Sequence, residues 1–474
     1  MKKYFTIGLL LLLGAGCSFS GKKSQEGSTS DNGLSDSQLL DSVQYRTFQY
    51  FWDGAEPNSG LARERVHLDG DYPQNDQNIV TTGGSGFGLM AILVGIERGF
   101  ISREEGFKRF TKAVDFLDKA DRFHGAWPHW LDGETGKVKP FSNYDDGGDL
   151  VETAFLVQGL LAVKHYFKDG SNEEQQLVEK IDQLWREVEW DWYTKGGEDI
   201  LYWHWSPNHG WKMDFGVTGY NEALIMYVLA ASSPTHPVQP SVYHQGWAQN
   251  GEIATEYTTF GYTLPLKHHV DAKKGGPLFW AHYSFLGLDP RGLTDQYGDY
   301  WQNNVAHTMI NRQHCINNPN EYKGYGENCW GLTSSYSVPG AAAYITGQSS
   351  EKPAQGNSEQ TGYAGHRPSF DLSVISPTAA LSSFPYAPDE VMPVIRHFYE
   401  DLGDKLWGKY GFYDAFSEEY QWFPRRYLAI DQGPVPVMIE NHRSGLLWDL
   451  FMQDEDVLNG LRRLGFKSPH SESE

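Results

Sequence analysis

Two kinds of helical pattern alternate along this chain, and the alternation limits its fold more than any other feature. One kind is amphipathic, with charges on one face, over residues 37–52, 103–119, 172–190 and 389–402. The other is apolar on nearly all sides and rich in small residues, over residues 83–96, 149–166, 219–231 and 444–451. A helix with one apolar face packs on the outside of a protein, whereas a helix that is apolar all round must be enclosed.

Outer and inner helices alternating through most of 474 residues predict an all-α fold, the toroid of six helical hairpins called an (α/α)6 barrel. An irregular helical arrangement is the alternative. Weaker helical patterns cover residues 278–285, 296–312, 331–344 and 373–381. The loops that enter inner helices share one end of such a barrel, where we expect the functional site. Strand-like pieces predict small β-hairpins over that end, within residues 199–213, 251–266 and 411–427.

Charge and aromatic content narrow the class of ligand. The chain has 39 basic and 61 acidic residues, and the net charge of −22 argues against a nucleic-acid partner. It also has 16 Trp and 27 Tyr, more than core packing usually requires. Because amphipathic rings provide flat surfaces on which sugars stack, a carbohydrate ligand is favoured.

The N-terminus predicts export. Lys2 and Lys3 precede an apolar run over residues 7–13, which is typical of a signal peptide and too short to span a membrane. The small residues that end in Cys17 resemble a bacterial lipoprotein box, so we expect residues 1–17 to be a signal peptide and Cys17 to carry lipid. Gly14 departs from that pattern, which leaves ordinary secretion as the alternative.

A polar segment over residues 18–35 has nothing to bury and predicts a flexible tether, followed by one catalytic domain over residues 36–470. We therefore expect a periplasmic or outer-membrane lipoprotein of a Gram-negative bacterium, in contact with the membrane only through its lipid. Two further cysteines, Cys315 and Cys329, either pair in an oxidising compartment or stay free.

Four carboxylates in eight residues are the first candidate for chemistry: Asp145, Asp146, Asp149 and Glu152, at the start of a segment that is otherwise apolar. If a helix begins near Asp146, then Asp145, Asp149 and Glu152 project toward one side. Crowding would raise at least one pKa, as acid–base catalysis requires. N-capping by one or two of these residues is the structural alternative, and it leaves the others unexplained.

Glu222 is the second candidate, at the first turn of an expected inner helix. Apolar residues on the following turn would raise its pKa, which suits a residue that protonates a departing glycosidic oxygen. Asp414, in an aromatic loop, is a weaker candidate for contacting substrate, and loop hydrogen bonding is the alternative.

Aromatic residues between these acids predict sugar subsites. We expect the indoles of the loop after residue 200 to face a ligand, together with a second cluster upstream of the carboxylates and the tyrosine two residues before Glu222. These candidates are Trp203, Trp205, Trp211, Trp127, His129, Trp130 and Tyr220.

Several motif matches fail on context. Residues 86–91 fit a dinucleotide fingerprint, but strands and helices do not alternate after them, so we interpret the glycines as close helix packing. Residues 145–149 fit the acidic motif of isoprenoid synthases, whose substrate is absent from an exported protein. The chain has no His-Glu-x-x-His and no Gly-x-Ser-x-Gly, so it lacks the sequence motifs on which a zinc hydrolase or a serine hydrolase assignment would rest.

The segments Tyr-Asp-Asp-Gly-Gly-Asp-Leu-Val-Glu-Thr-Ala and Gly-Tyr-Asn-Glu-Ala, with the run from Asp431 to Trp448, resemble glycoside hydrolase family 144, a bacterial family earlier labelled glucoamylase. The resemblance covers nearly all of the chain after the tether. It implies an (α/α)6 fold and inverting hydrolysis of β-1,2-glucan or its oligosaccharides without a metal or cofactor, by endo action or by release of sophorose. The important acids of the family match Asp145, Asp149, Glu152 and Glu222, with Glu222 as the best match to the proton donor.

The leading hypothesis is therefore an exported, monomeric β-1,2-glucan hydrolase, in which Glu222 is the acid and the group of Asp145, Asp149 and Glu152 serves as base and substrate clamp. Two alternatives stay open. One is an α-glucan glucoamylase, and the other is a lipoprotein that captures glycans without cleaving them. A binder would need the indoles but not the costly buried acids.

Overall fold

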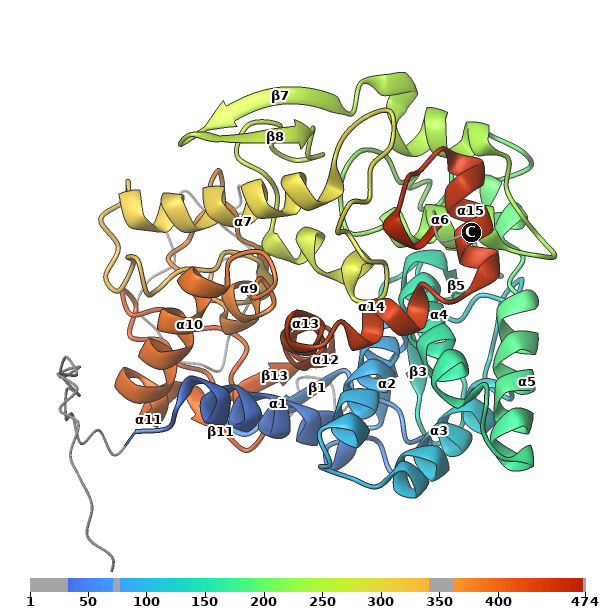
Figure 1. Cartoon of the computed structure of the whole chain (residues 1–474), viewed down its shortest axis with the longest axis horizontal. Helices are drawn as coiled ribbons and strands as arrows, with labels where there is room; N and C mark the ends of the chain where they lie inside the picture. The colour runs from blue at the N-terminus through green and yellow to red at the C-terminus, as the bar shows by residue number, and fades with distance from the viewer. Residues whose placement is uncertain (1–32, 71–76, 341–361, 472–474) are drawn as a thin grey trace, which may run out of the picture.

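The computed structural model describes residues 33–70, 77–340 and 362–471, and it is built mainly from helices in an inner and an outer layer. The inner helices are α2 (Thr82–Glu97), α4 (Leu150–Phe167), α6 (Leu224–Ser232), α13 (Pro434–Arg443) and α14 (Leu446–Phe451). The outer helices are α1 (Asp36–Trp52), α3 (Arg103–Leu117), α5 (Asn172–Arg186), α10 (Pro388–Arg396) and α15 (Glu455–Leu464). Figure 1 shows α5 and α10 on opposite sides of the molecule, with α13 and α14 between them. The prediction of an all-α fold with two helical layers, as in an (α/α)6 barrel, is confirmed.

Local sequence explains both layers. The outer helices α3 and α5 begin with capping boxes, in which Ser102 pairs with Glu105 and Ser171 with Glu174. The inner helices α2 and α4 cross so closely that a Cβ on Gly86 would overlap the backbone of Phe155. The glycines of residues 86–91 therefore serve helix packing, as predicted.

Four further helices lie in the described part of the chain, and the two that the sequence predicts begin at residues 300 and 377, each four residues after the expected start. The four are α7 (Tyr300–Asn317), α9 (Pro377–Leu381), α11 (Gly403–Leu406) and α12 (Ala429–Gln432). The expected helix over residues 278–285 consists of two 3-10 turns, Leu278–Ala281 and Tyr283–Phe285. The helix expected over residues 331–344 is wrong, because its described part contains a strand.

Short antiparallel strands connect the loops that lead into the inner helices. They are β1 (Arg65–His67) with β13 (Arg426–Leu428), β2 (Ile79–Thr81) with β3 (Trp130–Asp132), β3 with β4 (Val138–Lys139), β5 (Gly148–Asp149) with β6 (His204–Trp205), β7 (Ala254–Thr259) with β8 (Tyr262–Leu266), β9 (Ser334–Ser337) with β10 (Gly362–Gly365), and β11 (Trp407–Gly408) with β12 (Gly411–Phe412). Strands occur in all three loops where the sequence predicts hairpins, but only residues 251–266 form a two-stranded hairpin of their own, β7 with β8; β6, β12 and β13 pair with strands outside their loops.

The signal peptide, Cys17 and residues 18–32 of the expected tether lie outside the described residues. Cys315 and Cys329 are both buried and both free. Among the described residues, no helix combines the length and the apolar character that crossing a membrane requires.

Candidate active site

A cavity of about 420 Å³ lies where several of these strands meet. Strands β1 and β13 supply Arg65 and Leu428, β3 supplies Trp130, and β9 supplies Tyr336. Glu152, at the first turn of α4, faces the same cavity. The cavity therefore brings together segments that lie hundreds of residues apart in the chain.

Glu222 lines this cavity from a turn just before α6. The helix begins at Leu224, so the expectation that Glu222 belongs to the first helical turn is wrong by two residues. The hydroxyl of Ser284 donates a hydrogen bond to the backbone carbonyl of Glu222 and holds the turn in place. Burial raises the pKa of the Glu222 carboxyl to about 7; its own backbone N–H opposes the rise, and the charge of Asp149 adds to it.

Asp149 anchors a network behind the cavity wall. Its side chain is fully buried and caps α4, because Oδ1 accepts the Glu152 backbone N–H at 2.8 Å. The other oxygen, Oδ2, accepts a hydrogen bond from His129 Nδ1 at 2.8 Å and one from the Trp203 indole N–H at 2.9 Å. Asp149 therefore orients His129 and Trp203, which both line the cavity.

His129 is held in its charged form. Burial by itself would lower the pKa of the imidazole, but the negative charges of Glu152, Asp149 and Asp145 raise it to about 10. Within the described residues, His129, Asp145 and Asp149 are close enough together to be considered as metal ligands. His129 Nδ1 and the Trp203 indole N–H both bond to Asp149 Oδ2, so in this structure the group forms a hydrogen-bond network. The absence of a metal stays a prediction.

Glu152 is the member of the acidic cluster that reaches the cavity. Its Oε2 accepts the backbone N–H of Gly83 at 2.8 Å. Burial raises the pKa of Glu152 to about 7, while the charge of His129 lowers it and that of Asp149 raises it. A Cβ on Gly83 would lie 2.6 Å from Oε2, so only glycine leaves room for this carboxylate.

The two remaining acids of the cluster hold the loop before α4. Asp145 is 4% exposed, and its Oδ1 lies 3.1 Å from His204 Nε2. Asp146 accepts hydrogen bonds from Ser206 and from the Asn208 amide, and these bonds outweigh partial burial and lower the pKa of Asp146. Asp145, Asp146 and Asp149 do not line the cavity. The helix begins at Leu150, so Asp145 does not share the helical face of Glu152 as expected.

The predicted aromatic contacts separate into three groups. Trp130 and Trp203 line the cavity, and the Arg65 guanidinium lies 5.2 Å from the centre of the Trp130 ring. Trp127 does not, because it is fully buried and its indole N–H donates to the Leu117 carbonyl.

Tyr220 is also wrong as a substrate contact, since its ring is fully buried and its hydroxyl bonds to Asn304. Trp205 and Trp211 lie outside this cavity and pack near a different aromatic residue, Trp192. The sequence could not separate the two roles of Tyr220, because a tyrosine that packs in the core and one that contacts substrate have the same side-chain chemistry.

Asp414 does not touch the cavity either. It is 1% exposed and accepts the Tyr336 backbone N–H at 2.8 Å. Burial raises the pKa of Asp414 to about 6, and a hydrogen bond from Asp431 opposes the rise. Asp431 in turn accepts the Tyr283 hydroxyl at 2.9 Å. The two buried carboxyls hold Tyr283 and Tyr336, which do line the cavity.

Sequence analysis missed Glu64, Tyr283, Tyr336 and Phe279 among the residues that line the cavity. Glu64 immediately precedes β1, and its carboxylate lies 4.0 Å from the Arg65 guanidinium. Phe279, Tyr283 and Tyr336 fall in segments that the sequence predicts as helices, over residues 278–285 and 331–344, and no motif marks Glu64. Asp431 in the C-terminal motif is a buried carboxyl and needs a hydrogen-bond donor, so the sequence indicates that some donor such as the Tyr283 hydroxyl must lie nearby.

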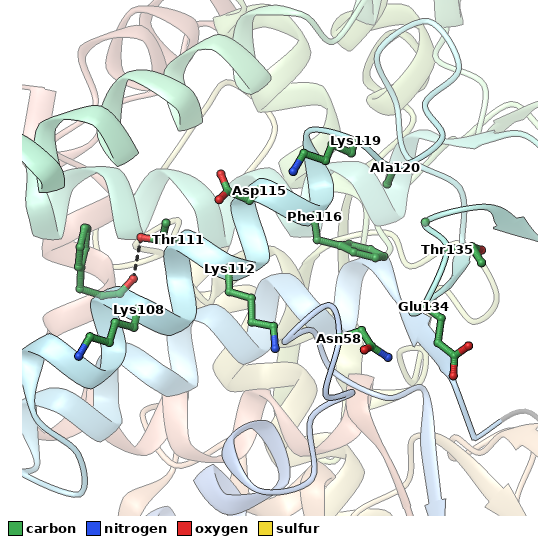
Figure 2. Close-up of a pocket in the computed structure, with 12 residues that line it drawn as sticks. Asn58, Lys108, Thr111, Lys112, Asp115, Phe116, Lys119, Ala120, Glu134 and Thr135 are labelled. Carbon is green, nitrogen blue, oxygen red and sulfur yellow. Dashed lines mark hydrogen bonds between the residues drawn. The ribbon is translucent and has the colours of Figure 1, made fainter.

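A larger hollow, about 630 Å³, lies on the outer face of α3 (Figure 2). It is lined by three lysines, of which Lys108 pairs with Glu104 and Lys112 donates to the Pro57 carbonyl. The hollow contains neither Glu152 nor Glu222. Size alone therefore does not identify the site, and the chemistry gathers in the smaller cavity.

Comparisons with known proteins show which family and which folds this chain resembles. A protein-family model described as “Putative glucoamylase” matches residues 214–455. The structure of an endo-β-1,2-glucanase from Chitinophaga pinensis, in complex with sophorotriose and glucose, is 58% identical to this chain, with a TM-score of 0.87 over 92% of this chain and 100% of that one.

An exo β-1,2-glucooligosaccharide sophorohydrolase (non-reducing end) from Parabacteroides distasonis is 44% identical over 91% of this chain, which spans 58% of that protein's length. The structure of an endo-β-1,2-glucanase from Talaromyces funiculosus with sophorose is 11% identical, with a TM-score of 0.58 over 92% of this chain and 93% of that one. That likeness shows a shared fold and nothing more.

Proposed function

This chain belongs to the family described as “Putative glucoamylase”, and from that membership we propose that it is a glycoside hydrolase of family 144 that cleaves β-1,2-glucosidic bonds in β-1,2-glucan or its oligosaccharides with inversion. One observation carries the chemistry. Two carboxyls with a raised pKa, Glu222 in the turn before α6 and Glu152 in the first turn of α4, face one aromatic cavity. The similarity to two β-1,2-glucan-cleaving enzymes supports the choice of linkage.

In the proposed reaction, Glu222 is the general acid. Its raised pKa keeps the carboxyl protonated up to about neutral pH, so it can give its proton to the glycosidic oxygen as the C–O bond breaks. Apolar surroundings on the α6 side favour the neutral form before the reaction. Tyr283 and Phe279 line the same cavity and exclude water from the leaving group.

Glu152 is the base, supported by the buried network of Asp145 and Asp149. It takes a proton from water as that water attacks the anomeric carbon, and the charged His129 favours the ionised carboxylate before this step. Inversion requires room for the water between acid and base, typically about 6.5–9.5 Å between the carboxyls. Glu152 on α4 and Glu222 in the turn before α6 come from separate segments, and these satisfy that requirement more readily than neighbours on one helix.

The substrate clamp consists of rings and of hydrogen-bonding groups that suit a neutral sugar. Trp130, stacked under Arg65, and Trp203, held by Asp149, present aromatic surface to the cavity. His129 and Glu64 supply a donor and an acceptor for hydroxyl groups.

The test is incubation of residues 36–474 with linear β-1,2-glucan and with soluble starch in parallel, with products resolved by chromatography and the new anomeric centre followed by proton NMR. We expect product from the β-1,2-glucan only, formed first as the α-anomer. Sophorose alone at early times indicates exo action, and a ladder of oligosaccharides indicates endo action. Cleavage of starch alone, or no product from either polymer, would refute the proposal.

We also propose that the protein is exported and is anchored, through lipid on Cys17, to a membrane that faces the periplasm. We propose further that it acts as a monomer and without a metal. The support is the signal-peptide pattern and the polar segment that precedes α1. Metabolic labelling with a palmitate analogue should mark the wild type and not Cys17→Ser, and light scattering of residues 36–474 should give one chain per particle. Labelling of Cys17→Ser would contradict the anchor.

A further inference from the structure

The indoles that the cavity leaves unused gather on the flank of the molecule. Trp192, in the 3-10 turn Trp190–Thr194, is 39% exposed although tryptophan is normally well buried. Its ring stacks on the ring of His124, with centroids 3.7 Å apart and planes 12° apart. Trp211 lies 6.5 Å from Trp192 at an interplanar angle of 30°. We call Trp192, Trp211 and His124 the indole platform.

The platform is rigidly supported. Trp205 stands edge-on to both Trp192 and His124, at 6.0 Å and 4.9 Å between centroids. His124 Nδ1 lies 3.0 Å from the Glu189 carboxylate, which fixes the ring that backs Trp192. A preformed aromatic face binds a ligand at a lower entropic cost than a mobile one.

The surroundings of the platform are hollow and acidic. A surface hollow of about 640 Å³ is lined by Trp192 and Trp211, by Glu189 and Asp191, and by Gly196. A Cβ on Gly196 would meet nothing within 4 Å, so this edge of the hollow is open. The basic groups of the lining are both paired: Lys195 with Asp214, and His236, whose Nδ1 lies 3.2 Å from Asp191 Oδ1.

This chemistry selects a neutral polyol. The carboxylates accept hydrogen bonds from hydroxyl groups and repel anionic polymers, while the indole faces stack on the apolar face of a pyranose ring. The hollow shares no lining residue with the catalytic cavity. One loop connects the two sites, since Trp203 lines the cavity and Trp211, eight residues later, lines the hollow.

We propose that the indole platform is a second, non-catalytic binding site for a β-glucan chain. The proposal deepens the proposed function, because it takes its ligand from the substrate class named there. A polymer held at the platform raises the local concentration of glycosidic bonds near the cavity, whereas a trisaccharide is too short to gain from a second site.

The experiment compares Trp192→Ala with Phe260→Ala, which removes a similarly exposed ring, 40% exposed, from the turn between β7 and β8. Trp192→Phe keeps an aromatic face as a conservative variant. Each protein is run in native gels with and without β-1,2-glucan, and kcat/KM is measured on the polymer and on a β-1,2-linked trisaccharide. Folding is checked by circular dichroism and Tm.

For Trp192→Ala we expect at least about a threefold loss of gel retardation and of polymer kcat/KM, with trisaccharide kcat/KM unchanged within about twofold. Phe260→Ala should match the wild type, and Trp192→Phe should recover part of the loss. If Trp192→Ala unfolds, Trp211→Ala takes its place.

Equal gel retardation of a folded Trp192→Ala and of the wild type would overturn the proposal, because the platform would then contribute nothing to glucan binding. An equal loss on polymer and trisaccharide would overturn it too, since the platform would then belong to the catalytic cleft. If the wild type cleaves no β-1,2-glucan, the proposed function fails, and the gel comparison still decides between binding and no binding at Trp192.

Discussion

Replacing Glu222 with glutamine should abolish turnover and stabilise the fold, and the stabilisation should depend on pH. The side chain keeps its shape but loses the proton that the leaving oxygen requires. General acid catalysis contributes roughly 10²–10⁴-fold, so we expect less than about 1% of the wild-type kcat. In the wild type, activity should be highest near pH 7: it falls at higher pH because Glu222 loses its proton, and it falls at lower pH because Glu152 gains one.

The effect on stability follows from the same pKa. Near pH 4 the carboxyl is protonated in both the folded and the unfolded chain, so it adds no pH-dependent penalty. Between pH 4.5 and about 7 the unfolded chain loses the proton while the folded chain keeps it, so the free energy of unfolding falls as the pH rises. Above about pH 7 the penalty is constant.

A rise in pKa from 4.5 to about 7 corresponds to at most about 3 kcal/mol, at about 1.4 kcal/mol per pKa unit. Because the residue is half-buried, solvent screening reduces this, and we expect about 1–3 kcal/mol. Glu222→Gln should therefore raise the free energy of unfolding by that amount at pH 8 and by about 1 kcal/mol or less at pH 5.

Urea denaturation at pH 5 and pH 8 measures this difference, and kcat is measured on the same preparations. Glu179→Gln, which changes an exposed carboxylate on α5, is the matched control and should leave activity and stability unchanged at both pH values. More than a few per cent of residual activity in Glu222→Gln would remove Glu222 from the acid role. A stability gain that is equal at both pH values would refute the raised pKa.

Three further substitutions test the site. Trp203→Phe removes the indole donor to buried Asp149 and should cost about 1–3 kcal/mol in urea denaturation together with activity, whereas unchanged stability would show that water replaces the indole. Gly83→Ala forces a Cβ toward Glu152 and should lower kcat at least about tenfold, while Gly326→Ala, whose Cβ has nothing within 4 Å, should be neutral in the same assay. Trp127→Phe should lower Tm without changing KM, because Trp127 belongs to the core; a raised KM would return it to the substrate site.

The sequence alone determined the layers and singled out Glu152 and Glu222, two acids that line the cavity. The spacing of apolar and charged residues decides which helix face can meet water, so the outer helix α5 and the inner helix α4 could be predicted within a few residues. Acids beside apolar runs are costly in any fold, which is why Glu152 and Glu222 stood out.

Which side chain reaches the cavity was decided only by the tertiary structure. Trp203 and Trp211 look alike in the sequence, yet one lines the cavity and the other the flank, because the loop between them turns back on itself through a close pairing of Ser206 with Gly210. Glu64 and Tyr283 entered the site through contacts between segments far apart in the chain, and no local pattern records such contacts. Local periodicity determines which side chains of a helix are buried. Which side chains meet in the cavity depends on how distant loops pack together, and periodicity does not record that packing.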